Sequence, residues 1–250
     1  MRRFFDNSLA VLNPVDIVET FTGRNKRELG LPERAIIVFH TGDLRRLIHR
    51  TGAEIVDQWS GFRSIYRVPQ SNVVITRSHF GGPYIAAIVE ELSSFGVQEF
   101  ILFGYCGAIS DTLQLGDLLM ANGALREDGV SYHYLDDPAE IIYSDWAGTW
   151  LLPARERGLH EGLIWSCDAI YRETASKIER YREQGMLAVE MEVASLYAVC
   201  TFKGLKGIAF LVVSDVFSGG TWKGGFHTGA LKKGVRELSD FIVEKAITYP

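Results

Sequence analysis

Cysteines, long apolar runs and net positive charge are all scarce in this chain of 250 residues. Its three cysteines, Cys106, Cys167 and Cys200, are odd in number and widely spaced, which predicts reduced thiols and excludes a disulfide framework. The longest apolar runs, such as 208–213, fall far short of the roughly 20 residues that a membrane-spanning helix requires. The formal net charge of -5 gives no support to a nucleic acid or an anionic membrane as partner.

Metal-ligand patterns and targeting signals are also missing. The six histidines form no HExxH motif and no Cys/His cluster with ligand spacing, so we expect no metal site. Residues 1–16 carry two arginines but only a brief apolar stretch, which makes a poor signal peptide. The seven prolines are scattered and mark no linker. We therefore expect a cytoplasmic protein that forms one large domain or two small ones.

Apolar runs rich in β-branched residues alternate with helical patterns along most of the chain. Strands are predicted at 35–39, 73–77, 100–104, 116–121, 162–167 and 207–214. Helices are predicted from Pro83 to a stop at Gly96, from 189 to 203 before Gly204, and over 231–246. This alternation favours an α/β domain with a mainly parallel sheet, in which active sites gather at the carboxyl ends of the strands.

The first predicted strand is followed by a glycine and arginines. Gly42 stands at the turn into a helix, where backbone N–H groups can approach an anion, and Arg46 lies one turn later. The segment is either a phosphate cradle or an ordinary glycine turn with surface arginines. After the third strand, Cys106 is interpreted as a small buried filler, since no catalytic partner is identifiable.

Two carboxylates, Glu190 and Glu192, stand at the entry of the second predicted helix. Residues two apart on a helix are separated by about 200° of rotation, so the two side chains should face opposite ways. One of them can enter a pocket and accept hydrogen bonds from the vicinal diol of a ribose, while the other meets solvent or a structural partner. The alternative is a pair of helix-start acids favoured by the helix dipole.

The last predicted strand ends at Ser214 and Asp215. An aspartate at this position is either a general acid with a raised pKa or a helix cap. Residues 218–229 contain five glycines and are predicted to form a mobile loop. Lys223 and His227 in this loop either bring donors to a substrate or belong to an ordinary flexible segment.

Five short motifs follow one another along the chain: Gly42-Asp43 with Arg46; Gly81-Gly82-Pro83 leading into 88–92; Gly104-x-Cys106-Gly107-Ala108-Ile109 followed by 115–117; Val189-Glu190-Met191-Glu192; and Val213-Ser214-Asp215. Together they resemble the nucleoside phosphorylase family that contains bacterial uridine phosphorylase and the hexameric purine nucleoside phosphorylases. The resemblance covers residues 35–215, which is most of the chain.

The resemblance implies that residues 1–250 form a single α/β domain built around a mixed, barrel-like sheet flanked by helices. It implies homodimers that share active sites, often assembled as a trimer of dimers, and a pentosyltransferase of nucleoside metabolism. In that reaction phosphate cleaves the N-glycosidic bond of a nucleoside and gives free base and ribose 1-phosphate, with no cofactor. Carried over by position, Gly42 and Arg46 hold phosphate. The residues carried over to the nucleoside are Met191 and Glu192 for the ribose, and Tyr171, Ser214 and Asp215 for the base, with Asp215 protonating a departing purine.

Some positions depart from the family pattern. Leu102 stands where the phosphorylases carry a phosphate-binding arginine, and Tyr105 stands where they carry serine or threonine. The arginine that a neighbouring subunit usually contributes aligns near Asp57, with Arg63 close by. Arg63, Lys223 or His227 could replace a missing arginine. Two alternatives to phosphorolysis therefore stay open: a nucleosidase that uses water, and a nucleoside-binding descendant without activity.

The nature of the base follows from two further positions. Uridine phosphorylases read uracil with a glutamine and an arginine just after the Asp-x-x-Tyr segment, and this chain has Thr174 and Ser176 there. The pair Ser214-Asp215 follows the purine pattern instead. The resemblance therefore favours a purine nucleoside, as in purine salvage.

Overall fold

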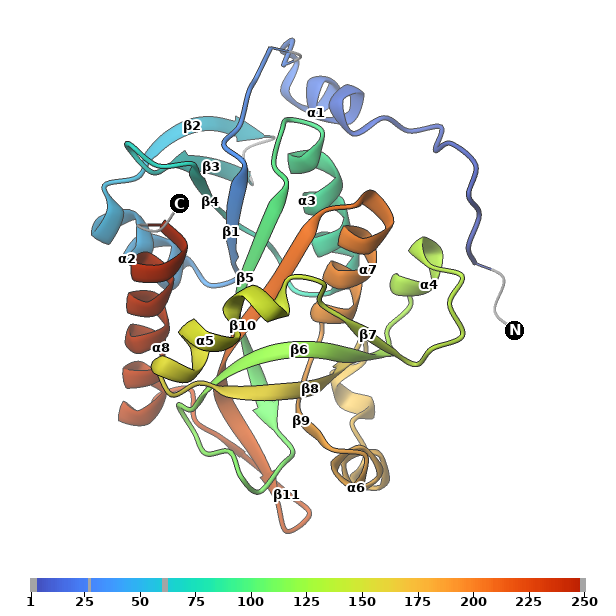
Figure 1. Ribbon diagram of the computed structural model, residues 1–250, viewed down its shortest axis with the longest axis vertical. Helices are drawn as coiled ribbons and strands as arrows, with labels where there is room; N and C mark the ends of the chain where they lie inside the picture. The colour runs from blue at the N-terminus through green and yellow to red at the C-terminus, as the bar shows by residue number, and fades with distance from the viewer. Residues whose placement is uncertain (1–3, 27, 60–62, 248–250) are drawn as a thin grey trace.

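The strands join into one sheet in the computed structural model, which describes residues 4–26, 28–59 and 63–247 (Figure 1). In chain order these strands are β1 (Arg34–Val38), β2 (Glu54–Trp59), β3 (Arg63–Arg67), β4 (Val73–Arg77), β5 (Glu99–Ala108), β6 (Leu118–Glu127), β7 (Ile141–Tyr143), β8 (His160–Cys167), β9 (Met186–Glu190), β10 (Lys206–Ser218) and β11 (Thr221–Gly224). The predicted strand at 73–77 coincides with β4, and the one at 35–39 is shifted by one residue from β1. The predicted strand at 116–121 overlaps the start of β6, and the other three lie within β5, β8 and β10.

The sheet closes on itself because β5 pairs with β10 as well as with β9 and β1. The strands β5, β10, β6, β8 and β9 thus form a ring, and β1, β4, β3 and β2 extend from β5 as an open arm. The ring combines parallel pairs such as β5 with β10 and antiparallel pairs such as β5 with β9. The mixed, barrel-like sheet is therefore confirmed, whereas alternation alone had predicted a mainly parallel one.

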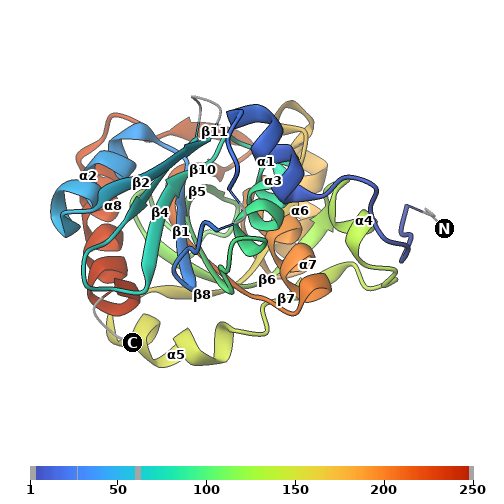
Figure 2. The same cartoon turned by 90° about the horizontal axis from the view of Figure 1, so that it is seen from above.

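Helices flank the sheet in two groups (Figures 1 and 2). In chain order they are α1 (Pro14–Thr22), α2 (Thr41–Thr51), α3 (Gly82–Ser93), α4 (Ser131–Tyr134), α5 (Ala147–Glu156), the 3-10 helix η1 (Ile170–Arg172), α6 (Ala175–Glu183), α7 (Val193–Lys203), α8 (Gly229–Ile242) and the π-helix η2 (Val243–Ile247). Helices α3 and α7 contact each other on one side of the sheet, and α2 and α8 contact each other on the other side. None of the helices in the described part of the chain is long and apolar enough to cross a membrane.

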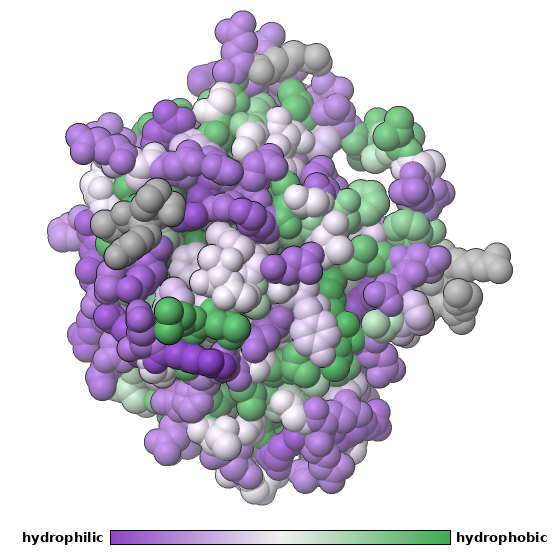
Figure 3. Space-filling model, in the orientation of Figure 1, coloured by the Kyte–Doolittle hydropathy of each residue, from purple (hydrophilic) through white to green (hydrophobic). Residues whose placement is uncertain are grey.

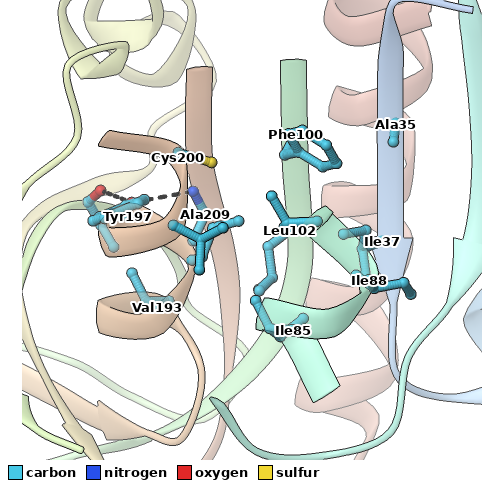
Figure 4. Close-up of a cluster of buried hydrophobic side chains, with 14 of the residues drawn as sticks. Ala35, Ile37, Ile85, Ile88, Phe100, Leu102, Val193, Tyr197, Cys200 and Ala209 are labelled. Carbon is cyan, nitrogen blue, oxygen red and sulfur yellow. Dashed lines mark hydrogen bonds between the residues drawn. The ribbon is translucent and has the colours of Figure 1, made fainter. Parts of the chain in front are cut away.

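Leu102 belongs to the apolar core between β1, β5, α3 and α7 (Figure 4). Its side chain is 1% exposed and lies with Ile85 and Phe100. Such a site accepts an isobutyl group readily and would penalise an unpaired guanidinium strongly. The leucine is therefore an integral part of the core of this chain.

Two predicted elements differ from the structure. Residues 189 and 190 end strand β9, and helix α7 begins only at Val193, because the backbone up to Glu190 pairs with β8 and β5. The predicted mobile loop is largely a hairpin: β10 continues to Ser218 and pairs with β11. Gly219 and Gly220 form its two-residue turn, and both have positive φ (57° and 75°), which glycine adopts without strain.

The face seen in Figure 3 is mostly hydrophilic on its left, where α2 and α8 lie, with apolar side chains scattered toward the middle and right. Larger exposed apolar groups occur in the segment before α1. Leu9 is 96% exposed there and Val11 is 99% exposed. The side chains of Leu9 and Val11 are therefore exposed to solvent in the isolated chain.

Candidate active site

A bulge in β10 positions Asp215. The pairing of β10 with β5 shifts register between Val213 and Asp215, and bulges of this kind re-aim a side chain. The carboxylate lies against the backbone of Gly107, where an added Cβ would stand 2.7 Å from its Oδ2. The Ser214 hydroxyl donates to Oδ1 at 2.6 Å, and the Trp222 indole N–H donates to Oδ2 at 2.8 Å. Two donors from its own chain therefore hold this carboxylate.

Glu192 is buried at the N-cap position of α7 and is 6% exposed. Its Oε1 accepts a hydrogen bond of 2.5 Å from the backbone N–H of Gly81, just before α3. Burial raises the pKa of Glu192, and the neighbouring Glu190 carboxylate raises it further. The side chain thus joins the start of α3 to the start of α7.

Glu190 has a structural task. Its Oε2 accepts hydrogen bonds from the backbone N–H groups of Glu192 (2.6 Å) and Val193 (2.9 Å), and Oε1 accepts one from the Ser166 hydroxyl. Burial raises the pKa of Glu190. Glu190 caps the first turn of α7 from the preceding strand. These contacts give Glu190 a structural role, and the pocket role of Glu192 stays a prediction. The helical rotation offered for the division was wrong, because Glu190 ends strand β9 and is not in the helix.

The start of α2 has the features of an anion site. Its N-cap residue His40 makes no side-chain capping bond, and nothing lies within 4 Å of a Cβ built on Gly42. Arg46 follows in the next turn, and among the described residues its Nε has no hydrogen-bond partner. An uncapped helix N-terminus followed by an arginine with an unbonded Nε has the donors and the positive charge that favour a bound anion.

Tyr105 closes one side of this anion site. Its hydroxyl donates to Oδ2 of the buried Asp43 at 2.6 Å, and its ring meets His40 edge-on with centroids 4.7 Å apart. Burial raises the pKa of Asp43, partly offset by this hydrogen bond and by the charges of His40 and Arg46. The hydrogen bond to Asp43 thus holds the tyrosine against the first turn of α2.

Contacts and charge interactions connect the anion site to Asp215. The His40 and Phe80 rings lie 5.6 Å apart, and Phe80 precedes the glycine that contacts Glu192. Farther along, the charges of Glu190 and Asp215 both act on the thiol of Cys106, which is 3% exposed. Burial raises the pKa of this thiol well above its ordinary value, as expected for a filler. We call the region around Arg46, Glu192 and Asp215 the candidate site.

The remaining predicted residues take varied positions. Met191 is half-buried between β9 and α7. Ser214 is buried, and its hydroxyl also lies 3.3 Å from the Cys106 carbonyl. Tyr171, in η1, is 95% exposed in the isolated chain. No contact brings it to the other residues in the described part of the chain.

The three candidate replacements for a missing arginine also differ. Arg63 is buried and contacts the carboxylate of Glu91, and burial lowers its pKa to about 10. Lys223 and His227 are exposed, on β11 and in the turn after it. Asp57, at the other aligned position, pairs with Lys26 at 2.7 Å.

Sequence reasoning missed Glu173, which lies between η1 and α6. Its carboxyl group is half-buried and has no hydrogen bond or ion pair within the described part of the chain. Burial and the charge of Asp215 raise the pKa of Glu173 to about 7. The available signal was its place two residues after Tyr171, in the segment already assigned to the base.

Other acidic groups adjoin the candidate site. A cavity of about 850 Å³ between the end of β6 and α6 is lined in part by Asp128 and Asp168. The charge of Asp168 also acts on Glu192. No group of three or more His, Cys, Asp or Glu side chains could hold a metal ion in residues 4–26, 28–59 and 63–247.

Comparison with known proteins places the chain. The family model described as "Phosphorylase superfamily" matches residues 33–247. The guanosine phosphorylase of Halorubrum lacusprofundi is 35% identical over 159 residues, which cover 62% of this chain and 65% of that protein. A DeoD-type purine nucleoside phosphorylase of Bacillus cereus is 30% identical over 165 residues, or 64% of this chain and 69% of the relative. The chain thus spans just under two thirds of the length of the first of these relatives.

A pyrimidine enzyme and a solved structure match as well. The uridine phosphorylase of Salmonella typhimurium is 29% identical over 153 residues, covering 54% of this chain and 60% of that protein. The crystal structure of uridine phosphorylase from Vibrio fischeri has a TM-score of 0.71 at 21% identity and covers 86% of this chain and 91% of its own. The latter likeness concerns the fold. With the family model matching most of its length, the chain belongs to the phosphorylase superfamily.

Proposed function

We propose that the protein cleaves the N-glycosidic bond of a purine nucleoside with phosphate and releases free base and ribose 1-phosphate. The carrying observation is the arrangement of the candidate site. Arg46 follows the open N-terminus of α2 with its Nε unbonded among the described residues, the buried Glu192 bonds to the start of α3, and Asp215 is held at the bulge of β10. These are the groups that an anionic nucleophile, a ribose and a leaving base would need.

The chemistry explains this order of charges. Breaking the glycosidic bond leaves an oxocarbenium-like sugar, which the incoming phosphate and the Glu192 carboxylate would stabilise. A proton delivered at the Asp215 end turns the purine into a neutral leaving group. Nucleoside phosphorylases of this family need no cofactor and use phosphate as a substrate.

A purine is favoured over a pyrimidine at the base end. Thr174 caps α6, its hydroxyl lies 3.1 Å from that of Ser176, and neither side chain resembles the glutamine and arginine that read uracil. Two relatives carry the names guanosine phosphorylase and purine nucleoside phosphorylase. The uridine phosphorylases among the matches make pyrimidine nucleosides the necessary comparison in any assay.

Hydrolysis is the second candidate function, and two positions favour it. Leu102 is part of the core, and Tyr105 is bonded to Asp43 beside the anion site. Neither supplies the charge that a second phosphate-binding arginine would. In a hydrolase, water would take the place of phosphate beside Tyr105 and attack the sugar.

The deciding experiment measures base release from purine and pyrimidine nucleosides with and without phosphate and identifies the sugar product. Phosphate-dependent release of ribose 1-phosphate from purine nucleosides would support the proposal. Free ribose without added phosphate would establish the hydrolase instead. Nucleoside binding without base release would leave a binding protein.

Arg46→Ala is expected to raise the apparent KM for phosphate by about tenfold or more, because the variant loses a charge-assisted contact with the anion. The matched control is Arg45→Ala, since Arg45 is exposed on the same helix. The KM for the nucleoside should change little in either variant. Equal phosphate kinetics in the two variants would remove Arg46 from the phosphate site.

We also propose that the protein acts as a homodimer or a trimer of dimers. The exposed Leu9 and Val11 are suited to packing on a second copy. Sedimentation equilibrium should give a multiple of the 28.0 kDa chain. A monomer at the concentrations of the assay would contradict this assembly.

A further inference from the structure

The side chain of Tyr105 lies along the first turn of α2. Its ring meets the ring of His40, the N-cap residue, with centroids 4.7 Å apart, and its hydroxyl reaches Oδ2 of Asp43 at 2.6 Å. The backbone N–H groups of Thr41 and Gly42 precede the first intrahelical hydrogen bonds, one of which Asp43 donates to the His40 carbonyl at 3.1 Å. An anion that these two N–H groups hold therefore lies next to the tyrosine side chain.

The single proton of the Tyr105 hydroxyl is engaged by Asp43. The carboxylate of Asp43 is 4% exposed, and no other donor to it is found in the described part of the chain. A buried acceptor that loses its donor is strongly unfavourable, so the hydroxyl stays turned toward Asp43. Burial and the charge of Asp43 also raise the pKa of Tyr105, which therefore keeps its proton. The hydroxyl thus donates to Asp43 and not to a bound anion.

A phenol oxygen that has given its one proton to a carboxylate offers only lone pairs to its other neighbours. Toward the anion site, Tyr105 is therefore an acceptor. The donors there are the N–H groups at the start of α2 and the guanidinium of Arg46, whose Nε is unbonded among the described residues. The serine or threonine that the family pattern has in place of Tyr105 can turn its proton toward an anion.

We propose that Tyr105 makes the anion site selective for an oxyanion that carries a hydroxyl proton, which the tyrosine oxygen accepts in a hydrogen bond. The proposal rests on the proposed function, in which phosphate is the nucleophile. The phosphate dianion still has one P–OH group, and the arsenate dianion has one As–OH group. Sulfate and selenate have no such group, so they would set an anionic oxygen against the tyrosine oxygen with no proton between them.

The first test compares inorganic anions on the wild-type protein by isothermal titration calorimetry. Phosphate and sulfate are measured above the second pKa of phosphate, where both are doubly charged and similar in size. We expect the Kd of sulfate to exceed that of phosphate at least about tenfold, because sulfate leaves the tyrosine oxygen opposite an unprotonated acceptor. Arsenate and selenate repeat the comparison with a larger central atom and should show the same preference.

Two substitutions of Tyr105 test whether it is the origin of the preference. Tyr105→Ser supplies a hydroxyl that can donate to either anion, and Tyr105→Phe removes the acceptor. In both variants the preference for phosphate should fall below about threefold, mainly through tighter binding of sulfate. Tyr143→Phe, on β7 and exposed, is the matched control and should keep the wild-type preference.

Two further measurements place the effect and check the fold. Arg46→Ala should weaken both anions alike, which assigns the calorimetric signal to this site. Thermal unfolding follows the Tyr105 variants, because each leaves Asp43 without its donor. In the base-release assay sulfate should inhibit the wild type weakly and Tyr105→Ser strongly in competition with phosphate. The comparison of anions on the wild type does not depend on any variant.

The outcomes separate the two proposals. Equal affinities for phosphate and sulfate in the wild type, or a preference that both Tyr105 variants retain, would overturn the role of Tyr105. Phosphate-dependent base release would then leave the proposed function standing. A protein that binds none of these anions and releases base without phosphate would overturn both. A wild-type preference for phosphate and arsenate that is lost in the Tyr105 variants supports the selectivity.

Discussion

Asp215→Asn lowers kcat/KM for purine nucleosides at least about tenfold in the result we expect. The substitution preserves the size of the side chain and removes the negative charge on which both Ser214 and Trp222 converge. An asparagine amide cannot accept from both donors as the carboxylate does, because only its oxygen is an acceptor. The expected effect on turnover is therefore larger than that on the free energy of unfolding, which should fall by about 0.5–1.5 kcal/mol for one lost hydrogen bond.

The measurement is steady-state kinetics with guanosine or inosine, accompanied by thermal unfolding of both proteins. Unaltered turnover with an unaltered melting temperature would remove Asp215 from the proton transfer. Trp222→Phe is the informative companion, because it removes one hydrogen bond to Oδ2 and keeps an aromatic ring on the hairpin. Its loss should be smaller than that of Asp215→Asn.

Glu192→Ala should weaken the use of ribonucleosides far more than that of 2′-deoxyribonucleosides. A carboxylate that accepts from both ribose hydroxyls contributes charge-assisted bonds of about 1.5–3 kcal/mol each, roughly ten- to a hundredfold in kcat/KM. A 2′-deoxy substrate has already lost one of these bonds, so it has less to lose. The deoxynucleoside is thus the internal control, and equal losses for both sugars would contradict the diol assignment.

Stability must be followed in the same variant, since Glu192 also accepts from the Gly81 N–H. Removing the carboxylate leaves that donor without its partner and should cost about 1–3 kcal/mol of unfolding free energy. Glu192→Gln retains an acceptor for Gly81 and separates the two effects. A folded Gln variant with a large ribose-dependent loss would assign the carboxylate to the sugar.

Local sequence signals predicted the elements that depend on local structure. The β4 strand, the helix that follows Pro83 and the turn at Gly42 each carry their own apolar pattern or punctuation. The motif residues of the candidate site could be named for the same reason. Arg46, Glu192 and Asp215 each stand at the end of a recognisable strand or the start of a helix.

Long-range contacts account for what was missed. Glu190 reads as a helical residue because an apolar run follows it, yet its backbone pairs with β8 and its side chain caps α7 from outside. The charge interaction of Glu173 with Asp215 depends on the order of strands in the sheet, since β6 pairs with both β8, which precedes Glu173, and β10. Neither relation has a local signature.

The departures from the family pattern at Leu102 and Tyr105 also separate what the sequence reveals from what only the fold reveals. The sequence reveals the exchange of an arginine for leucine and of a small hydroxyl residue for tyrosine. That Leu102 is in the core and that Tyr105 is bound to Asp43 depends on α3 and α2, which pack on β5 from opposite sides. The surroundings in the fold therefore show that Leu102 is an apolar core residue and that Tyr105 is a hydrogen-bond donor to a carboxylate, which the two residue types alone do not reveal.

The ring of strands is closed on one side by a short pairing between β5 and β9. Strands β5 and β9 pair through only two residues of each, Gly107 with Val189 and Ala108 with Ala188, whereas β5 and β10 pair along most of their length. Glu190 ends strand β9 directly after this short pairing, and Glu192 follows it. Asp215 lies on the other side of β5, where it pairs with the same Gly107. A nucleoside that spans Glu192 and Asp215 would connect the strands on either side of the shortest pairing in the ring, so its binding would stabilise the closed barrel against opening there.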